Sequence, residues 1–264
     1  MAMMIHSQKR TPGPVVAIGT SSNGFIGKTI QYVGKVAHAA DAPDQGINAL
    51  NAAMLGIMGI NALRETFRDD DAIRVHPIIT KGGDLVNNVP DDVRIETYVR
   101  AKTMDAIDRT NAKVDAALRA GGAAIGAKVN IDTLPGQLPL ICNQEMNELF
   151  VHNAQEAFPA VEITNAGHFS ASTDMGDVSH LMPAIHPFIG GVDGLLHGPD
   201  FKVVDFKAAA LLPGKAFAGM VIDLLSDDAK EARKILAAFK PALTREQYIA
   251  KLDGYFSEEE PDHD

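Results

Sequence analysis

Apolar residues in the first half of the chain follow two spacings, which predict strands and helices in turn. Ile26, Ile30 and Tyr32 fall on one side of a strand over residues 25–36, because successive side chains of a strand point to opposite faces. Over residues 47–67 the apolar side chains recur at steps of three and four, as they do on one face of a helix. The segment therefore begins with a strand and a helix.

The pattern continues with two strands, a helix and a strand. Residues 73–80 and 94–100 alternate between apolar and polar side chains, and residues 129–133 alternate again. Between them, Thr103 can cap a second helix, which the glycine pair Gly121-Gly122 is expected to end. The order β-α-β-β-α-β is that of the ferredoxin-like arrangement, in which two helices cover one face of a four-stranded antiparallel sheet.

The residues outside this module predict a second domain, into which the module is inserted. Ser/Gly-rich and Pro/Gly-rich stretches flank the module and indicate hinges. Further helices are expected over Gln144–Ala157, Lys215–Leu225 and Asp228–Phe239, and another is expected from a capping box at Thr244–Gln247. We predict an α/β protein in four parts: residues 1–22, a ferredoxin-like domain over 23–136, residues 137–256, and an acidic, disordered tail over 257–264.

Composition narrows the classes of partner. With 34 acidic against 24 basic residues, the formal net charge of -10 argues against nucleic acid as a partner. The longest apolar stretch, residues 50–63, is shorter than the roughly 20 residues that span a bilayer. Residues 1–10 lack the apolar core of a signal peptide, so we expect a cytoplasmic protein without a membrane partner. The single cysteine, Cys142, excludes an internal disulfide and is expected to be a buried structural thiol.

Polar groups that could carry chemistry lie in turns and loops. His38 stands among small residues just after a strand, and Asn87 lies in a Gly-bounded loop that is either a hairpin connection or a ligand-binding segment. Asp174 belongs to a short run of hydroxyls and carboxylates that suits a helix cap as well as a site. The remaining candidate histidines have irregular spacing, which does not by itself define a metal site: His6, His180, His186 and His197.

Seven motifs, taken together in their order, resemble the zinc aminoacylase and carboxypeptidase family, peptidase family M20. The resemblance is strongest to its aminobenzoyl-glutamate hydrolase and dipeptidase-like branch. The motifs are Met3–His6, Gly34–Ala40 with Gly46–Leu50, Val75–Gly83, Val86–Asp91, Ser172–Ser179, Ile185–Pro187 and Leu196–Phe201. The resemblance implies a metal-binding catalytic domain interrupted by a ferredoxin-like dimerisation, or lid, domain. It also implies amide hydrolysis by two zinc ions, or other divalent metals, with a glutamate as general base.

Site residues are carried over from the family motif by motif. His197 and His6 match metal-ligand histidines. His38 matches the lid histidine that stabilises the oxyanion in the partner subunit's site, and Asn87 matches a lid asparagine that binds the polar end of the substrate. Asp174 and His186 match positions that line the substrate pocket.

The sequence also departs from the family pattern. The N-terminal metal motif and Glu-Glu pair of the family do not precede Met1, and Ser7 follows His6 where a proline is usual. We therefore expect an amidohydrolase or peptidase that acts on N-acyl amino acids, aminobenzoyl-glutamate-like compounds or small dipeptides. Alone, this chain is expected to be inactive and to bind metal weakly, and to form a homodimer through the lid. The N-terminal half that activity requires is either a separate chain or a part of the protein missing from this sequence. The alternative is a non-enzymatic dimerisation or ligand-binding relic of that family.

Overall fold

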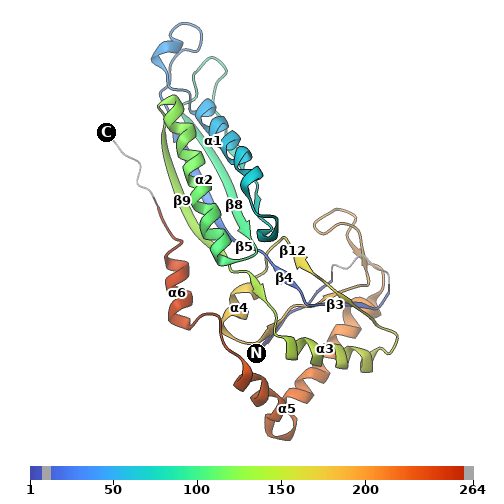
Figure 1. Ribbon diagram of the computed structural model, residues 1–264. Helices are drawn as coiled ribbons and strands as arrows, with labels where there is room; N and C mark the ends of the chain where they lie inside the picture. Colours follow the sequence, from blue (N-terminus) through green and yellow to red (C-terminus); the bar gives the residue numbers. More distant parts are fainter. Residues whose placement is uncertain (8–12, 259–264) are drawn as a thin grey trace. The chain divides into compact units, whose positions relative to one another are not determined.

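The computed structural model describes residues 1–7 and 13–258, which form two compact units (Figure 1). Unit 1 comprises Met1–Ser22 with Leu138–Glu246, and unit 2 comprises Asn23–Gln137 with Gln247–Asp264. Each unit combines helices and strands, so the expected α/β class is confirmed. The units are described separately below.

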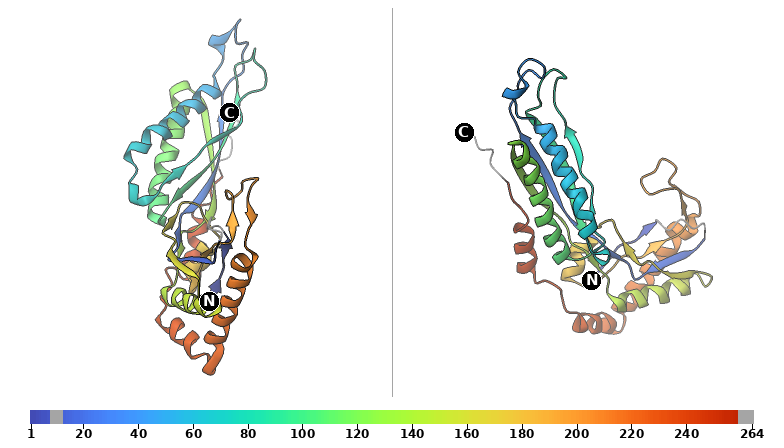
Figure 2. Two further views of the ribbon diagram at one scale, coloured as in Figure 1. Left: turned by 90° about the vertical axis from the view of Figure 1, so that its right-hand side faces the viewer. Right: turned by 45° about the horizontal axis from the view of Figure 1, so that its top comes forward.

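Unit 2 is built on an antiparallel sheet in which two long strands flank a third, central strand. Strand β5 (Gly24–Val33) pairs with β8 (Asp92–Ala101) on one side and with β9 (Lys128–Gln137) on the other. The short strands β6 (Arg74–Val75) and β7 (Ile78–Lys81) both pair with the far side of β8. Helices α1 (Ala49–Leu63) and α2 (Met104–Ile125) cover one face of the sheet (Figure 2). This is the predicted ferredoxin-like order, with the expected strand over 73–80 divided at His76-Pro77 because proline cannot donate to a sheet.

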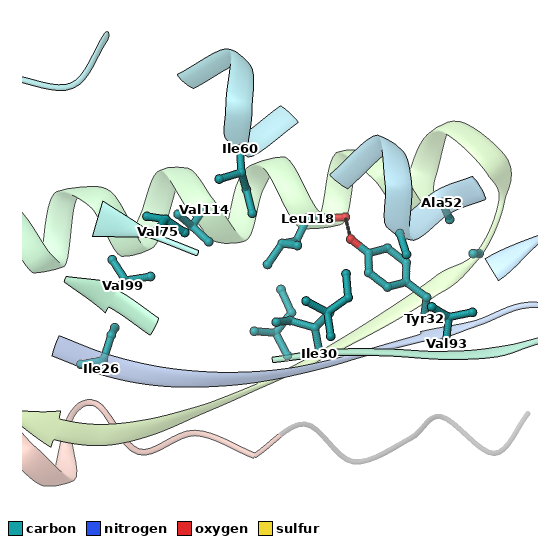
Figure 3. Packing of buried hydrophobic residues seen from close by; sticks show 14 of the residues in the cluster. Ile26, Ile30, Tyr32, Ala52, Ile60, Val75, Val93, Val99, Val114 and Leu118 are labelled. Carbon is teal, nitrogen blue, oxygen red and sulfur yellow. Dashed lines mark hydrogen bonds between the residues drawn. The ribbon is translucent and has the colours of Figure 1, made fainter. Parts of the chain in front are cut away.

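The core of unit 2 lies between this sheet and its two helices. Ile26, Ile30 and Tyr32 of β5 are fully buried there, as their alternation predicted, and they face apolar residues of α1 and α2 (Figure 3). The Tyr32 hydroxyl donates a hydrogen bond of 2.9 Å to the carbonyl oxygen of Leu118. Burial raises the pKa of Tyr32, so this donor keeps its proton.

Helix α2 does not end at Gly121-Gly122, and this expectation from the sequence was wrong. The helix continues to Ile125 and ends at Gly126, whose φ of 81° is left-handed and whose N–H bonds to the carbonyl of Gly122. Gly121 instead faces α1, where it leaves no room for a side chain. The two glycines therefore serve close packing rather than helix termination.

A lysine also enters this core, although nothing in the sequence pattern singled it out. Lys28 of β5 is 2 % exposed, and its ammonium group lies 2.7 Å from a carboxylate oxygen of Asp115 on α2. It also donates a hydrogen bond of 2.8 Å to the hydroxyl of Thr133 on β9. Buried charges persist when they are paired and hydrogen-bonded in this way.

The C-terminal segment packs on unit 2 rather than with the residues 137–256 with which we grouped it. From helix α6 (Arg245–Asp253) onward, Lys251 and Tyr255 each bond to a different carboxylate oxygen of Asp108, at 2.6 Å and 2.7 Å. Ser257 then exchanges two backbone hydrogen bonds with Thr133 of β9. We call residues 245–258 the strap. Of the acidic tail predicted over 257–264, residues 259–264 lie outside the described part of the chain.

Unit 1 contains a four-stranded sheet in the order β11-β3-β14-β2. Strand β3 (Val15–Ile18) runs parallel to β11 (Glu162–Asn165) and antiparallel to β14 (Phe188–Ile189), which in turn runs parallel to β2 (His6–Ser7). Helices α3 (Gln144–Ala157) and α5 (Leu212–Ala238) pack together and share a core with this sheet. The predicted helix over 144–157 is thereby confirmed.

Short elements complete unit 1, and each has two to seven residues. They are β1 (Ala2–Met3) beside β13 (Ala184–Ile185), β4 (Ser21–Ser22) between β10 (Leu140–Ile141) and β12 (His168–Phe169), β15 (Val192–Asp193) beside β16 (Lys202–Val203), and helix α4 (Met175–Leu181). Periodicity in the sequence did not predict α4 because seven residues hold barely two turns.

Helix α5 is interrupted near its middle. The sequence predicted two separate helices here, over Lys215–Leu225 and Asp228–Phe239, and the interruption agrees with that prediction. Residues 226–229 leave the helical conformation, and Asp227, Asp228 and Ala229 have positive φ. Among the described residues, Lys207–Ala238 is the one helical stretch that meets the length and hydropathy requirements for crossing a membrane. One such helix is weak evidence for a membrane span, because the core helix of a soluble protein passes the same test. Leu212, Ala216 and Met220 of this stretch are fully buried in the core of unit 1.

Candidate active-site residues

Two histidines, one from each of the two chain segments that form unit 1, are brought together by a pair of parallel strands. His6 of β2 lies opposite Phe188 of β14, and the His6 N–H bonds to the carbonyl of Pro187. Nδ1 of His6 then lies 2.5 Å from Nε2 of His186, with the ring centroids 4.7 Å apart. At this separation one of the two nitrogens must carry the shared proton and the other must accept it.

His186 is held in its neutral form by its surroundings. Burial and, to a smaller extent, the nearby His6 lower the pKa of this imidazole to about 4, and the carboxylate of Asp174 opposes both effects. The ring packs at 5.3 Å from that of Phe188, and Nδ1 of His186 has no hydrogen-bond partner among the described residues. Near neutral pH, His186 is therefore a neutral base or ligand rather than a cation.

Asp174 and Cys142 border the histidine pair. Asp174 stands exposed just before α4 and accepts a hydrogen bond of 3.3 Å from the Thr173 hydroxyl. Burial raises the pKa of the Cys142 thiol to about 11, although a hydrogen bond with the His186 backbone opposes this rise. A thiol with this pKa stays protonated, which suits the structural role expected from the sequence.

His197, unlike His186, is an exposed loop residue. It lies in the loop between β15 and β16, with a φ of 62°, and its side chain is exposed. Its ring forms no hydrogen bond, ion pair or ring contact with the described residues. His6 thus pairs with His186, and the metal-ligand roles that we predicted for His6 and for His197 stay predictions.

A metal site would need several donor side chains close together. Within residues 1–7 and 13–258, no group of three or more His, Cys, Asp or Glu side chains could hold a metal ion. A catalytic zinc usually takes three protein ligands and a water. His6 and His186 instead point their nitrogens at each other. This part of the chain does not build a complete metal centre.

In unit 2, backbone pairing places His38 beside Asn87. The His38 and Asn88 backbones form a β-bridge, and the Ala39 N–H donates to the carbonyl of Asn87 at 2.8 Å. Both side chains are exposed. The structure therefore joins the two lid residues that the sequence placed in separate motifs.

The local backbone fixes which nitrogen of His38 carries the proton. Its Nδ1 accepts hydrogen bonds from the N–H groups of Ala40, at 3.3 Å, and Asp41, at 3.1 Å. A nitrogen that accepts from two amides has no proton, so the neutral ring carries its proton on Nε2. His38 thus presents an exposed N–H donor. Beside it, the two loops line an open hollow of about 690 Å³ whose polar side chains include Asn48, Asn51 and Asn88.

Comparison with known proteins places these residues in a family. Residues 20–125 match the peptidase dimerisation domain of the M20 type. Xaa-Arg dipeptidases from Mus musculus and Homo sapiens are 31% and 28% identical to the chain over 236 and 233 residues. These matches support assignment of the chain to the M20 peptidase family. Each match covers 85% of this chain and 51% or 53% of the relative, so the chain spans about half the length of the curated relatives it matches.

Solved M20 structures share the fold at low sequence identity. An aminobenzoyl-glutamate utilization protein from Klebsiella pneumoniae has a TM-score of 0.64 at 16% identity, covering 84% of this chain and 54% of that one. A dinuclear metal-binding peptidase of the M20 family from Bacillus subtilis has a TM-score of 0.61 at 17% identity, covering 84% and 56%. His38 and Asn87 lie inside the matched dimerisation domain, whereas the other candidate residues lie outside it.

The sequence pattern did not single out Arg100, an arginine on the face of the sheet away from α1 and α2. The Arg100 guanidinium lies 4.9 Å from the ring centroid of Phe25 and 5.1 Å from that of Tyr98. Burial lowers the pKa of Arg100. Alternation along β8 did place Arg100 on the polar face, but only the strand register, which pairs Phe25 with Arg100, brings the rings to it.

Proposed function

We propose that the chain acts in a metal-dependent amidohydrolase or peptidase, with small dipeptides or N-acyl amino acids as substrates. The proposal is supported by the match to the M20 dimerisation domain and by the dipeptidase relatives. The observation that carries it is the fixed tautomer of His38, because an exposed, preoriented N–H donor is what an oxyanion requires.

In the proposed reaction, water adds to the amide carbonyl, the C–N bond breaks, and a carboxylate and an amine leave. Nε2–H of His38 donates a hydrogen bond to the oxygen that becomes negative as water adds. Asn87 binds the polar end of the substrate through its side-chain amide. A divalent metal such as zinc would supply the activated water when bound. Asp174 and His186 would line the pocket, and His6 and His197 would contribute metal ligands.

The chain is proposed to act as a homodimer through unit 2. Among the described strands, β7 pairs with β8 alone, so its other edge is open to a partner strand. Ile78 and Ile79 on β7 are 49% and 42% exposed, and Met54 and Met58 on α1 are 50% and 62% exposed. Exposed apolar side chains next to an open edge suit a second copy of the same surface. Sedimentation of the full chain at micromolar concentration should give the mass of two chains.

Completion of the metal site requires further protein ligands beyond those described. We propose that a segment equivalent to the part of the M20 relatives that this chain does not cover supplies them, either in the same polypeptide or as a separate chain. We also propose that the assembly works in the cytoplasm.

A reconstitution experiment tests the function. The uncovered segment of the mouse relative is added, as a fusion or as a separate chain, and hydrolysis of dipeptides ending in arginine and of aminobenzoyl-glutamate is measured with zinc. His38→Ala should lower kcat by about 10²- to 10³-fold with a small change in KM, since the donor acts in the transition state. His152→Ala, which removes an exposed histidine of α3, is the matched control and should be fully active.

Two outcomes would contradict the proposal. If the reconstituted wild type and His38→Ala hydrolyse equally well, His38 is not the oxyanion donor. If no reconstituted form hydrolyses any substrate while the chain still forms dimers, the chain is a non-enzymatic dimerisation protein of the M20 family.

A further inference from the structure

Helix α5 of unit 1 (Figure 1) is apolar on two opposite sides. On one side, Leu212, Ala216, Met220 and Leu224 are buried in the core of unit 1. On the opposite side, exposed residues with no charge recur at steps of three and four, with Ile222 beside them: Leu211, Gly214, Ala218, Val221 and Leu225. We call these six residues the outer stripe. A helix that is apolar all round is normally covered on every side.

The outer stripe leaves large apolar side chains in contact with water. Ile222 and Leu225 are 64% and 65% exposed, and Leu211 and Val221 are 43% and 42% exposed. Single apolar residues are ordinary on a protein surface, whereas a row of them along about four turns of one helix marks an interaction site. The stripe therefore calls for a partner.

The spacing and the small residues of the outer stripe select a helix as that partner. Alternating steps of three and four residues allow one helix to pack along another. A β-carbon at Gly214 would meet nothing within 4 Å, and Ala218 adds only a methyl group. A second helix can thus approach the backbone of α5 closely at these two positions while its side chains pack against Ile222 and Leu225.

A membrane suits the outer stripe less well than a helix. The opposite side of α5 is already packed in the core of unit 1, so lipid cannot surround this helix. Helices that lie on anionic membranes are rich in cations. Residues 200–225 instead balance three lysines against three aspartates: Lys202, Lys207 and Lys215, and Asp200, Asp205 and Asp223.

The outer stripe begins next to one of the predicted metal ligands. The Ser7 hydroxyl of β2 donates a hydrogen bond of 3.5 Å to the carbonyl oxygen of Ala209, two residues before Leu211. Strand β2, which carries His6, is an edge strand among the described strands. A segment that lays a helix along α5 can therefore also add a strand to β2, and it then reaches the surroundings of His6.

The relatives of the chain contain a segment long enough to provide such a helix. The matches cover 51% and 53% of the two Xaa-Arg dipeptidases, so about half of each relative lies outside them. We propose that the outer stripe of α5 binds an amphipathic helix of the segment that corresponds to this uncovered half. The inference rests on the proposed function, which requires the same segment for the metal site.

Reactivity of an introduced cysteine tests the docking. Ile222→Cys is treated with a maleimide in the chain alone and in a fusion of the chain with the uncovered segment of the mouse relative. Mass spectrometry locates the label, which separates it from Cys142. We expect labelling at position 222 to be about tenfold slower or more in the fusion, because a packed helix excludes the reagent. Leu236→Cys is the matched control: Leu236 is 52% exposed on the part of α5 beyond the interruption, and it should react equally in both.

A charge substitution tests whether the outer stripe contributes to binding. The chain and the segment are co-expressed as separate chains, and capture of the segment is measured. Ile222→Glu should lower capture by about tenfold or more, because docking would bury an unpaired carboxylate. Leu236→Glu is the control and should capture as much as wild type. Both side chains are exposed in the chain alone, so circular dichroism should show both variants folded.

Docking and hydrolysis can fail separately in these experiments. Capture and protection without hydrolysis contradict the proposed function alone, whereas hydrolysis that Ile222→Glu leaves unchanged contradicts the docking alone. Equal labelling of Ile222→Cys in a folded fusion and in the chain also contradicts the docking. If the fusion does not fold, capture in the co-expressed pair decides, and no capture by wild type overturns the proposal.

Other occupants of the outer stripe give different results with the chain alone. Labelling of Ile222→Cys that slows as the chain concentration rises would mean that a second copy covers the stripe. Labelling that slows on addition of phosphatidylcholine–phosphatidylserine vesicles would mean that a membrane covers it. Either result overturns the proposal.

Discussion

Gly121 of helix α2 lies directly against Gly56 of helix α1, and a β-carbon on Gly121 would overlap the backbone of Gly56. It would also come within 2.5 Å of the carbonyl oxygen of Ala52. Both obstacles are backbone atoms, which cannot rotate away as a side chain can. The two helices thus approach each other as closely as their backbones allow, over a sheet whose side chains fill the remaining space (Figure 3).

Gly121→Ala should therefore destabilise the chain even though alanine favours helices. The gain in helix propensity is about 1 kcal/mol, whereas forcing extra volume into a packed interface costs about 1 to 3 kcal/mol and separates the helices. Urea denaturation should show a net loss. Gly214→Ala in α5 is the control, because a β-carbon there meets nothing within 4 Å, and it should be neutral or slightly stabilising. Equal stability of Gly121→Ala and wild type would contradict the close approach.

The buried ion pair of unit 2 gives a second prediction. Asp115→Leu removes the carboxylate at 2.7 Å from Lys28 and leaves the ammonium buried, where it still donates a hydrogen bond to the Thr133 hydroxyl. We expect a loss of about 2 kcal/mol, below the 3 to 5 typical of fully buried pairs because Asp115 is 28% exposed. The double variant Lys28→Met with Asp115→Leu should regain most of the loss, since it buries no unpaired charge. Additive losses in a double-mutant cycle would contradict the pairing.

A third prediction concerns the strap, residues 245–258. Asp108→Leu removes the acceptor of both Lys251 and Tyr255, so the strap should detach from α2 and become open to proteases. Limited trypsin digestion should cut at Lys251 several times faster than in wild type. Asp105→Leu, an acidic residue one turn earlier in the same helix, is the control and should be cut at the wild-type rate. Unchanged cleavage in Asp108→Leu would mean that Ser257 and Thr133 hold the strap without this cluster.

The sequence predicted those features of the fold that depend on neighbours along the chain. Alternation gave β5, β8 and β9, and the capping residue Thr103 gave the start of α2, because both signals are local. The role of Gly121 was misassigned because a glycine pair in a helix has the same sequence signature whether it ends the helix or receives another helix. Only the position of α1 decides between the two.

The candidate site was predictable in part for the same reason. His38 and Asn87 were found because each lies in a short polar loop of a recognisable motif, and the structure adds only their pairing. The contact between His6 and His186 could not be found, since 180 residues separate them and strands of two residues bring them together. The stack of Arg100 on Phe25 likewise depends on register between strands, which alternation within each strand does not specify.

The last prediction is a pH dependence of stability that arises from His180. This residue is 2% exposed, and its Nε2 lies 2.8 Å from the carbonyl oxygen of Pro139, to which the neutral ring donates. Burial lowers the pKa of His180 below its ordinary value of 6.5, and the Pro139 carbonyl opposes this shift. As the pH falls below 6.5, the unfolded chain takes up a proton at this position before the folded chain does. The stability is thus fully present above pH 6.5 and is lost progressively as the pH falls toward the folded pKa.

His180→Gln tests this, because glutamine can donate to the same carbonyl but does not titrate. The midpoint of urea unfolding should fall between pH 7.5 and pH 5 in both proteins, and the fall should be larger in wild type. His186, whose pKa burial lowers to about 4, contributes the same slope to both proteins and cancels in the difference. Measurements in the presence of a chelator remove any effect of metal on the histidine pair. If the two proteins lose stability in parallel, His180 takes up its proton equally in the folded and unfolded chains, and burial does not disfavour its charged form.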